Sequence, residues 1–263
     1  MAEGLVAEDV ALVHGRARIV EHLDLRVPPN RFTAVLGANG SGKSTILRAL
    51  AGLHRPAAGA IRLDGADLGA IGTRQRARRI GLLAQGATAP EGLTVEELVR
   101  QGRYPHRRLF GGWSSADGAA VEAALRATAT LELRGRPLEK LSGGQRQRAW
   151  VAMTLAQESD ILLLDEPTTY LDLGHQADLL GLLRRLVDAG GRTVVAVLHD
   201  LIQAARHADH IILLGRDGIL AQGAPAHVLT PDTLRAAYGI EVTILDDPDS
   251  GGPLCLPRPS PEP

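Results

Sequence analysis

The stretch Gly37-Ala38-Asn39-Gly40-Ser41-Gly42-Lys43-Ser44-Thr45 decides the fold of this 263-residue chain. The apolar run 32–36 precedes it, and the segment 46–50 follows it. This order predicts a strand, a glycine loop and a helix. It matches the G-x-x-x-x-G-K-[ST] pattern, in which glycines let backbone N–H groups surround a polyphosphate at a helix N-terminus. We therefore predict that the stretch binds the polyphosphate of a nucleotide, with Lys43 on the β and γ phosphates and the Ser44 hydroxyl on Mg²⁺.

Charge and composition narrow the classes of function. The chain carries 29 Lys+Arg against 30 Asp+Glu, and 3% of its residues are aromatic. It therefore lacks the positive field of a sequence-independent nucleic-acid binder and the side chains of a base-stacking surface. The single cysteine, Cys255, excludes an internal disulfide and a multi-cysteine metal site. We expect neither a signal peptide nor a membrane span, because no basic and apolar leader is present and no apolar run approaches about 18 residues.

The order of the other segments predicts an α/β fold. Residues 4–36 alternate apolar and polar side chains, which indicates antiparallel strands ahead of the glycine loop. Residues 86–140 contain short capped helices and indicate an inserted helical subdomain. Farther on, apolar strands alternate with helices, as in a parallel sheet covered on both faces. We expect the strands at 161–164, 193–198 and 211–214 and the helices at 174–189 and 200–207.

Two acids, Asp165 and Glu166, end the apolar run 161–164. Ligands bind at the carboxyl edge of a parallel sheet, so both carboxylates are expected beside the phosphates. Asp165 suits an outer ligand of the Mg²⁺ held by Ser44, and Glu166 suits a general base that orients the attacking water. The alternative is a buried strand followed by an ordinary acidic turn.

Two more polar residues end apolar strands. His199 follows 193–198 and is expected to contact the γ-phosphate, although a lone histidine is more often structural. Gln85 follows 80–84 and could ligate Mg²⁺ and move when the cation and the γ-phosphate arrive. An ordinary strand end explains Gln85 equally well.

A second glycine pair opens the helix that begins in Leu141-Ser142-Gly143-Gly144-Gln145-Arg146-Gln147-Arg148. This is a second anion site in a chain that already has one, and a monomer has no evident use for it. If two copies pair with two-fold symmetry, Ser142, Gly143 and Gly144 of each copy could close the nucleotide site of the other.

The set of motifs resembles that of ABC transporter ATPase subunits. The chain has, in the order typical of that family, the phosphate loop, Gln85, Leu-Ser-Gly-Gly-Gln, Leu-Leu-Leu-Asp-Glu-Pro, Tyr170-Leu171-Asp172 and His199. The segments between the motifs are similar to those of iron-chelate importer ATPases, as in Gly102-Arg103-Tyr104-Pro105-His106 and Pro167-Thr168-Thr169-Tyr170-Leu171-Asp172.

The resemblance implies a RecA-like P-loop NTPase core with an N-terminal antiparallel β subdomain and a helical subdomain at about 86–158. It implies one ATPase domain over 4–245 and a C-terminal extension, 246–263, whose proline-rich end is disordered. It further implies a homodimer on the cytoplasmic face of the cell membrane, under permease subunits that a substrate-binding protein supplies. The expected cargo is a ferric siderophore, with haem and cobalamin as alternatives.

Several residue roles rest on the resemblance alone. His14 aligns with an aromatic residue that stacks on adenine in the family, although it could equally be a solvated turn residue. Asp172 is expected to act across the dimer interface, and Gln145 belongs to the shared nucleotide site. The segment 86–113 is expected to receive the permease, with Tyr104, Phe110 and Trp113 either as docking anchors or as the core of the helical subdomain.

The resemblance also implies a cycle and leaves two rivals. Two ATP molecules close the dimer, and hydrolysis at Glu166 and His199 lets the halves separate. One rival is a soluble ABC ATPase acting on nucleic acid, which the composition disfavours. The other is a cytosolic ABC ATPase of iron–sulfur assembly.

The arginine cluster 74–79 fits a solvated helix face better than a binding patch.

Overall fold

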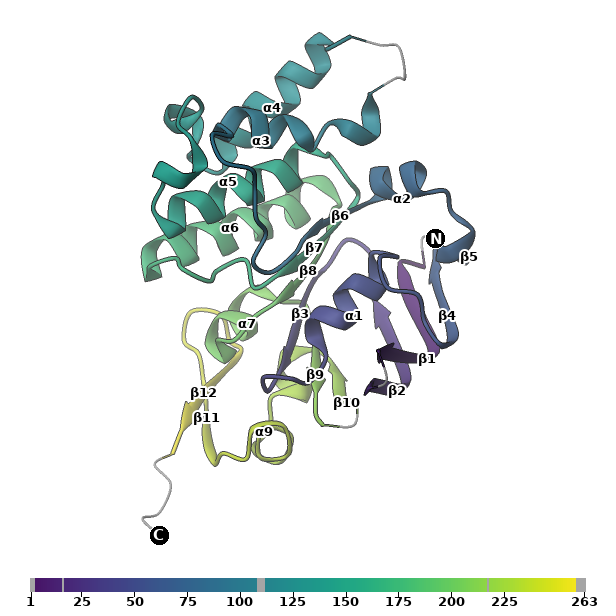
Figure 1. Ribbon diagram of the computed structural model, residues 1–263. Helices are drawn as coiled ribbons and strands as arrows, with labels where there is room; N and C mark the ends of the chain where they lie inside the picture. Colours follow the sequence, from purple (N-terminus) through teal and green to yellow (C-terminus); the bar gives the residue numbers. More distant parts are fainter. Residues whose placement is uncertain (1–2, 16, 108–111, 217, 259–263) are drawn as a thin grey trace.

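The computed structural model describes residues 3–15, 17–107, 112–216 and 218–258. Within them, a central sheet has the strand order β10-β9-β3-β8-β7-β6, in which only β10 is antiparallel to its neighbour (Figure 1). Its strands are β3 (Phe32–Gly37), β6 (Ile80–Leu83), β7 (Ile161–Asp165), β8 (Thr193–Val197), β9 (His210–Leu214) and β10 (Ile219–Gly223).

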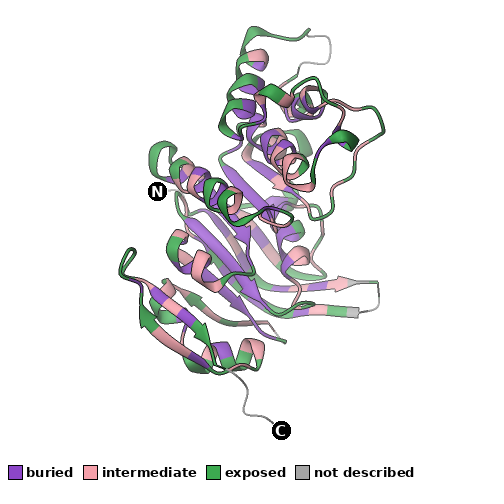
Figure 2. Ribbon diagram, turned by 90° about the vertical axis from the view of Figure 1, so that its left-hand side faces the viewer, coloured by how far each residue is buried: buried purple, intermediate pink, exposed green. Residues whose placement is uncertain are grey.

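The apolar strands of this sheet serve two cores because successive side chains point to opposite faces. In β7, Leu162 and Leu164 belong to one buried cluster, whereas Ile161 and Leu163 belong to the other. Both faces are therefore covered, and the strands lie buried at the centre of the molecule (Figure 2). The predicted parallel sheet between two layers is confirmed.

One of the two layers contains α1 (Lys43–Leu50) and an antiparallel sheet of order β2-β1-β4-β5. Its strands are β1 (Leu5–His14), β2 (Ala17–Val27), β4 (Ala58–Leu63) and β5 (Ala66–Asp67). Ile46 and Leu50 of α1 are buried against Leu5 and Val10 of β1 in one cluster. The antiparallel sheet thus fixes the helix that follows the glycine loop (Figure 1).

The other layer contains the helices of the later chain, together with the helical part that rises above the sheet in Figure 1. In that part, α3 (Val95–Gln101) and α4 (Ser115–Ala127) pack on α5 (Gly143–Ala156). Each of the three helices begins with a capping box, at Thr94, Ser114 and Ser142. The remaining helices are α2 (Thr73–Arg79), α6 (Leu173–Gly190), α7 (Leu201–His207), α8 (Pro225–Val228) and α9 (Pro231–Tyr238), with short 3-10 helices η1 (Leu68–Ala70), η2 (Tyr104–His106), η3 (Leu131–Leu133) and η4 (Leu138–Lys140).

The C-terminal region contains a hairpin that the sequence analysis does not anticipate. Strands β11 (Val242–Asp246) and β12 (Pro253–Pro257) pair, so the hairpin crosses the expected boundary between residues 245 and 246. Buried Val242 and Cys255 anchor it to the core, and Asp247 accepts two hydrogen bonds from Arg206 of α7, at 2.7 and 3.0 Å. The extension is therefore ordered through Pro257, although the disordered tail is expected to begin there, and Arg258 donates its backbone N–H to Glu241. Residues 259–263 of the expected tail lie outside the described part.

Candidate functional site

The glycine loop connects β3 to α1 as predicted, and two glycines make its path possible. Gly40 has φ = 81° and Gly42, the N-cap of α1, has φ = 90°, a backbone conformation that disfavours side chains. Within the described residues, the buried hydroxyl of Ser41 has no hydrogen-bond partner. An unpaired buried hydroxyl among free N–H groups at a helix N-terminus is a group that phosphate oxygens would satisfy.

Lys43 lies inside this loop. Its Nζ donates hydrogen bonds to the carbonyl oxygens of Gly37 and Ala38, both at 2.8 Å. The side chain is almost fully buried, and burial lowers the pKa of its ammonium, opposed by the nearby carboxylates of Glu166 and Asp165. The loop thus holds its own cation at the place where polyphosphate oxygens are expected.

Ser44 and Asp165 connect the loop to the end of β7. The Ser44 hydroxyl donates to Asp165 Oδ1 at 3.1 Å. Asp165 is buried, and this raises the pKa of its carboxyl, while hydrogen bonds from Ser44 and from the backbone of Gln85 act in the opposite direction. A hydroxyl backed by a carboxylate is an all-oxygen donor set, which suits a hard cation such as Mg²⁺.

Glu166 and His199 come from adjacent strands of the sheet. His199 Nε2 lies 2.8 Å from Glu166 Oε1, and Thr169 Oγ1 donates to Glu166 Oε2 at 3.2 Å. The backbone of Glu166 is left-handed, with φ = 51°, which is uncommon for a residue with a side chain. Seven other described residues with side chains also have a positive φ, so at Glu166 this conformation adds to the contacts of the carboxylate and does not by itself mark a functional site.

One cavity of about 540 Å³ brings the predicted phosphate-binding and catalytic residues together. Gln85 enters it from the end of β6 as an exposed side chain, beside the expected loop residues Asn39 and Thr45. The residues that line the cavity are Ile19, Asn39, Gly40, Gly42, Lys43, Ser44, Thr45, Gln85, Glu166 and His199. Their roles toward a nucleotide stay predictions. His14 ends β1, but its side chain lies outside what the structure describes, and so does its expected contact with adenine.

The second predicted anion site lies apart from this cavity. Ser142 caps α5 in a reciprocal pair with Gln145, in which each backbone N–H meets the other side chain at 3.2 Å. None of the residues 142–145 lines the phosphate cavity within the described chain. One copy therefore does not bring the two sites together, and their union in a dimer stays a prediction.

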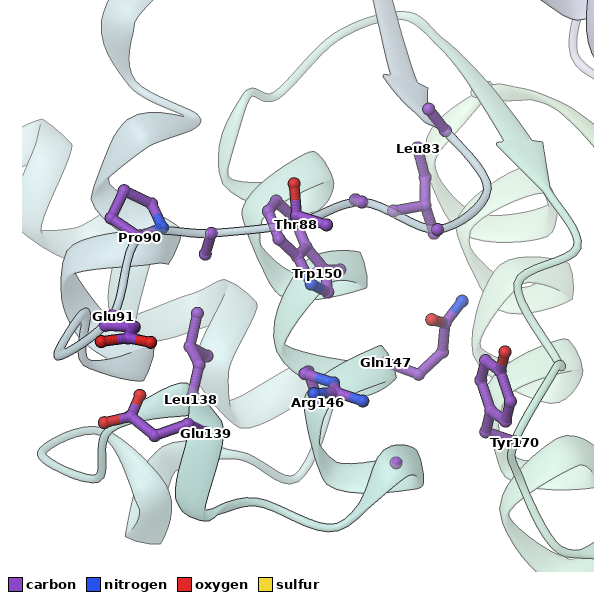
Figure 3. Close-up of a pocket in the computed structure, with 15 residues that line it drawn as sticks. Leu83, Thr88, Pro90, Glu91, Leu138, Glu139, Arg146, Gln147, Trp150 and Tyr170 are labelled. Atoms are coloured by element: carbon purple, nitrogen blue, oxygen red, sulfur yellow. The ribbon is translucent and has the colours of Figure 1, made fainter.

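A different cavity, of about 350 Å³, separates α5 from the loop that follows β6 (Figure 3). Gly143, Gln147 and Trp150 of α5 line it, opposite residues 86–91 and beside Tyr170. Gln147 Nε2 donates to the carbonyl oxygen of Pro167 at 3.1 Å and is 3.5 Å from that of Glu166. The helix that begins at the second predicted anion site thus holds the backbone next to Glu166.

Two further predictions concern Asp172 and the aromatic residues of the segment 86–113. Asp172 caps α6, accepting from the His175 N–H at 2.9 Å and lying 2.8 Å from its ring, and its role across an interface stays a prediction. Tyr104 is 61% exposed and Trp113 is 39% exposed, so neither forms the core of the helical part; Phe110 lies outside the described residues.

Sequence reasoning missed Thr169, Gln147 and Ile19 as parts of the site. Thr169 and Gln147 belong to motifs quoted above, but the motifs do not predict their contacts. Thr169 donates to the Glu166 carboxylate, and Gln147 donates to the carbonyl oxygen of the next residue, Pro167. Ile19 belongs to β2 and lines the cavity, and it lies so close to Gly42 that a Cβ added there would be 2.9 Å from its Cγ2. Among the described residues, no helix is both long and apolar enough to cross a membrane.

Comparisons with known proteins agree with this geometry. A family model described as ABC transporter matches residues 20–169. The ferric enterobactin transport ATP-binding protein FepC of Escherichia coli (strain K12) is 49% identical over 96% of this chain and 93% of its own length. The petrobactin import ATP-binding protein FpuD of Bacillus anthracis is 47% identical over 98% and 94%. The dimeric structure of MJ0796, a bacterial ABC transporter cassette, superposes with a TM-score of 0.76 at 27% identity, covering 84% of this chain and 98% of that one.

Proposed function

This chain belongs to the ABC transporter family and is an ATPase of that family, and from this premise we propose that it drives an importer of iron chelates. It would be the ATP-hydrolysing subunit, coupling closure of an ATP-bound dimer to uptake of a ferric siderophore through a membrane permease. Support for the cargo comes from relatives that transport ferric enterobactin and petrobactin and align along nearly the whole chain.

The observation that carries the proposal is the single cavity in which Lys43, Glu166 and His199 meet. A buried ammonium, a carboxylate and an imidazole within one space of about 540 Å³ provide phosphate binding and water activation side by side. Binding alone would need the first of these groups but not the other two.

Each group has a part in hydrolysis under this proposal. Lys43 and the N–H groups of the loop hold the β and γ phosphates, and Glu166 accepts a proton from the attacking water. His199 contacts the γ-phosphate and orients Glu166, which it already meets at 2.8 Å. Mg²⁺ would be held by Ser44 and Gln85 with Asp165 behind them, and it would neutralise charge on the phosphate oxygens.

A homodimer would complete each site. Ser142, Gly143 and Gly144 of one copy would contact the ATP bound by the other, so that ATP holds the two copies together. Loss of the γ-phosphate removes those contacts and lets the copies separate. The likeness to a dimeric ABC cassette supports this arrangement.

The permease would dock on the segment 86–113, at the cytoplasmic face of the membrane. Exposed Tyr104 and Trp113 support docking because large apolar side chains are favoured anchors of interfaces. A substrate-binding protein would deliver the chelate to the permease and would not touch this chain.

Co-purification from native membranes tests the proposal. The tagged protein is extracted in mild detergent, and the proteins that elute with it are identified by mass spectrometry. Recovery of a multi-span permease is expected, followed by loss of radiolabelled ferric siderophore uptake in cells that carry only Glu166→Gln. Recovery of soluble partners alone would contradict a transporter role, and uptake defects confined to haem or cobalamin would contradict the siderophore.

A further inference from the structure

The four arginines of α2 divide into two pairs with different surroundings. Arg79 pairs with Asp64 at 2.7 Å and also with Asp160. Arg76 packs on the backbone of Gly52, where an added Cβ would lie 2.7 Å from its Nε. These two side chains hold α2 to the core, so a solvated helix face explains neither of them.

Arg74 and Arg78 form the second pair and converge on one atom. The Nε of each donates to the carbonyl oxygen of Pro105 in η2, both at 2.9 Å. Both side chains are exposed, and a single acceptor fixes both guanidinium groups. Two like charges are thereby held well within a Debye length of each other, at a cost that a nearby anion would relieve.

No carboxylate in the described part of the chain forms an ion pair with Arg74, Arg78 or the neighbouring Arg107. Of the arginines close by, Arg79, Arg100, Arg103 and Arg134 pair with carboxylates. Arg76 instead donates to the backbone carbonyl oxygens of Leu68 and Ile71. The chain as a whole has a net charge of −1, so the uncompensated charge is local.

An aromatic ring lies among these charges. Tyr104 is 61% exposed, and the Arg107 guanidinium stands 5.7 Å from the centre of its ring. We call Arg74, Arg78, Tyr104 and Arg107 the α2–η2 patch. An exposed tyrosine beside fixed arginines has the composition of an interface hot spot.

We propose that the α2–η2 patch binds an acidic segment of the permease, whose carboxylates accept hydrogen bonds from Arg74 and Arg78. The inference rests on the proposed transporter function and adds the chemistry of the partner. Planar guanidinium groups match carboxylates in a two-bond geometry, and groups already fixed by Pro105 lose little freedom on binding.

Charge and shape favour a protein segment over a lipid surface. Recognition of anionic lipid typically uses clusters of four to eight basic residues on flexible or amphipathic segments. The patch instead has three arginines, two of them immobilised, around one tyrosine. A folded protein partner can place a carboxylate against the arginines and an apolar side chain against Tyr104 at the same time, and this matches the composition of the patch.

Rebinding to stripped membranes tests the proposal. Inverted vesicles from iron-starved cells of the source organism are washed with urea to remove peripheral proteins, and the purified protein is titrated onto them in a sedimentation assay. Arg74→Glu with Arg78→Glu is expected to weaken binding at least about tenfold. Arg185→Glu, at an exposed arginine of α6, is the matched control and should bind as the unmodified protein does.

Two further readouts make the outcomes decisive. The ATPase rate of each variant without membranes should equal that of the unmodified protein, which shows that the variants fold. Equal binding by the double variant and the unmodified protein would overturn the proposal. So would equally tight binding of the unmodified protein to protein-free vesicles with about 30% anionic lipid, since the partner would then be lipid. If the unmodified protein recovers no permease in the co-purification and does not bind stripped vesicles, the transporter function is contradicted, and the inference that rests on it is contradicted too.

Discussion

His199 Nε2 lies 2.8 Å from Glu166 Oε1, which joins the second residue after β8 to the first residue after β7. Thr169 occupies the other carboxylate oxygen of Glu166, at 3.2 Å. Both oxygens therefore have side-chain partners, and one must turn toward the γ-phosphate if Glu166 is to activate water. The imidazole is 48% exposed, whereas the Glu166 side chain is 15% exposed.

Replacing Glu166 by glutamine should separate ATP binding from hydrolysis. The amide keeps the shape of the side chain but cannot accept the proton, so turnover should fall by about 10²- to 10⁴-fold. ATP should still hold two copies together, which gel filtration with ATP would detect as a stable dimer. Glu122→Gln, at an exposed position of α4, should leave phosphate release unchanged. Normal hydrolysis by Glu166→Gln would remove Glu166 from the role of base.

Lys43 and Lys140 are the two lysines of the chain, which provides a matched pair of variants. Lys43→Ala removes a buried ammonium from the phosphate loop, so ATP affinity should fall at least about 100-fold, because charge-assisted phosphate contacts are strong. Lys140→Ala, at an exposed site, should bind ATP normally. Titration with a fluorescent ATP analogue distinguishes the two. Equal affinities would mean that the loop binds phosphate through its backbone alone.

Gln147 should matter for the rate of hydrolysis and not for ATP binding. Its amide holds the carbonyl oxygen of Pro167 at 3.1 Å, next to the left-handed backbone of Glu166. Without that bond, Glu166 can shift, and a displacement of about 1 Å can cost roughly 100-fold in rate. Gln147→Leu is expected to lower kcat about 10- to 100-fold with little change in KM for ATP. Gln75→Leu, on the exposed side of α2, serves as the control. A parallel rise in KM would indicate general disruption of the fold.

The core and the phosphate site could be predicted because their signals are local. The glycine pattern of the loop determines its backbone conformation, and wholly apolar strands indicate a buried parallel sheet. The sequence alone therefore predicts that Asp165 and His199 lie at the carboxyl edge of this sheet. Gln147 could not be assigned to Glu166 in the same way, because its partner is a backbone carbonyl 20 residues away.

The C-terminal hairpin and the arginines of α2 escaped prediction for a related reason. Short strands ending in proline resemble a disordered tail, and they are fixed by contacts made in the folded chain, among them the burial of Val242 and Cys255 and the ion pair of Asp247 with Arg206. Likewise, no pattern within 74–79 shows that Arg79 forms an ion pair with Asp160, whereas Arg78 pairs with no carboxylate of the described residues. Pairing of surface charges depends on the finished fold.

The packing of α4 within the helical part should depend on pH in a defined direction. Asp117 of α4 accepts hydrogen bonds from the Ser114 hydroxyl at 2.7 Å and from Arg103 Nε at 2.9 Å, and both members of the ion pair are buried. The Ser114 hydroxyl, and after it Arg103, lowers the pKa of Asp117 to about 2. Because this pKa is lower in the folded than in the unfolded state, the stabilisation is complete above about pH 5 and is lost as the pH falls toward 2.

Asp117→Asn tests this dependence. At pH 7 it should lower the free energy of unfolding by about 1–3 kcal/mol, since Arg103 stays buried with one acidic partner fewer. The difference from the unmodified protein should shrink between pH 4 and pH 3, because the unfolded carboxyl takes up its proton there. Urea unfolding at pH 7, 4 and 3 measures it, with Asp178→Asn on the exposed face of α6 as the control. A difference that stays constant over this range would mean that Asp117 acts through the shape of its side chain and not through its charge.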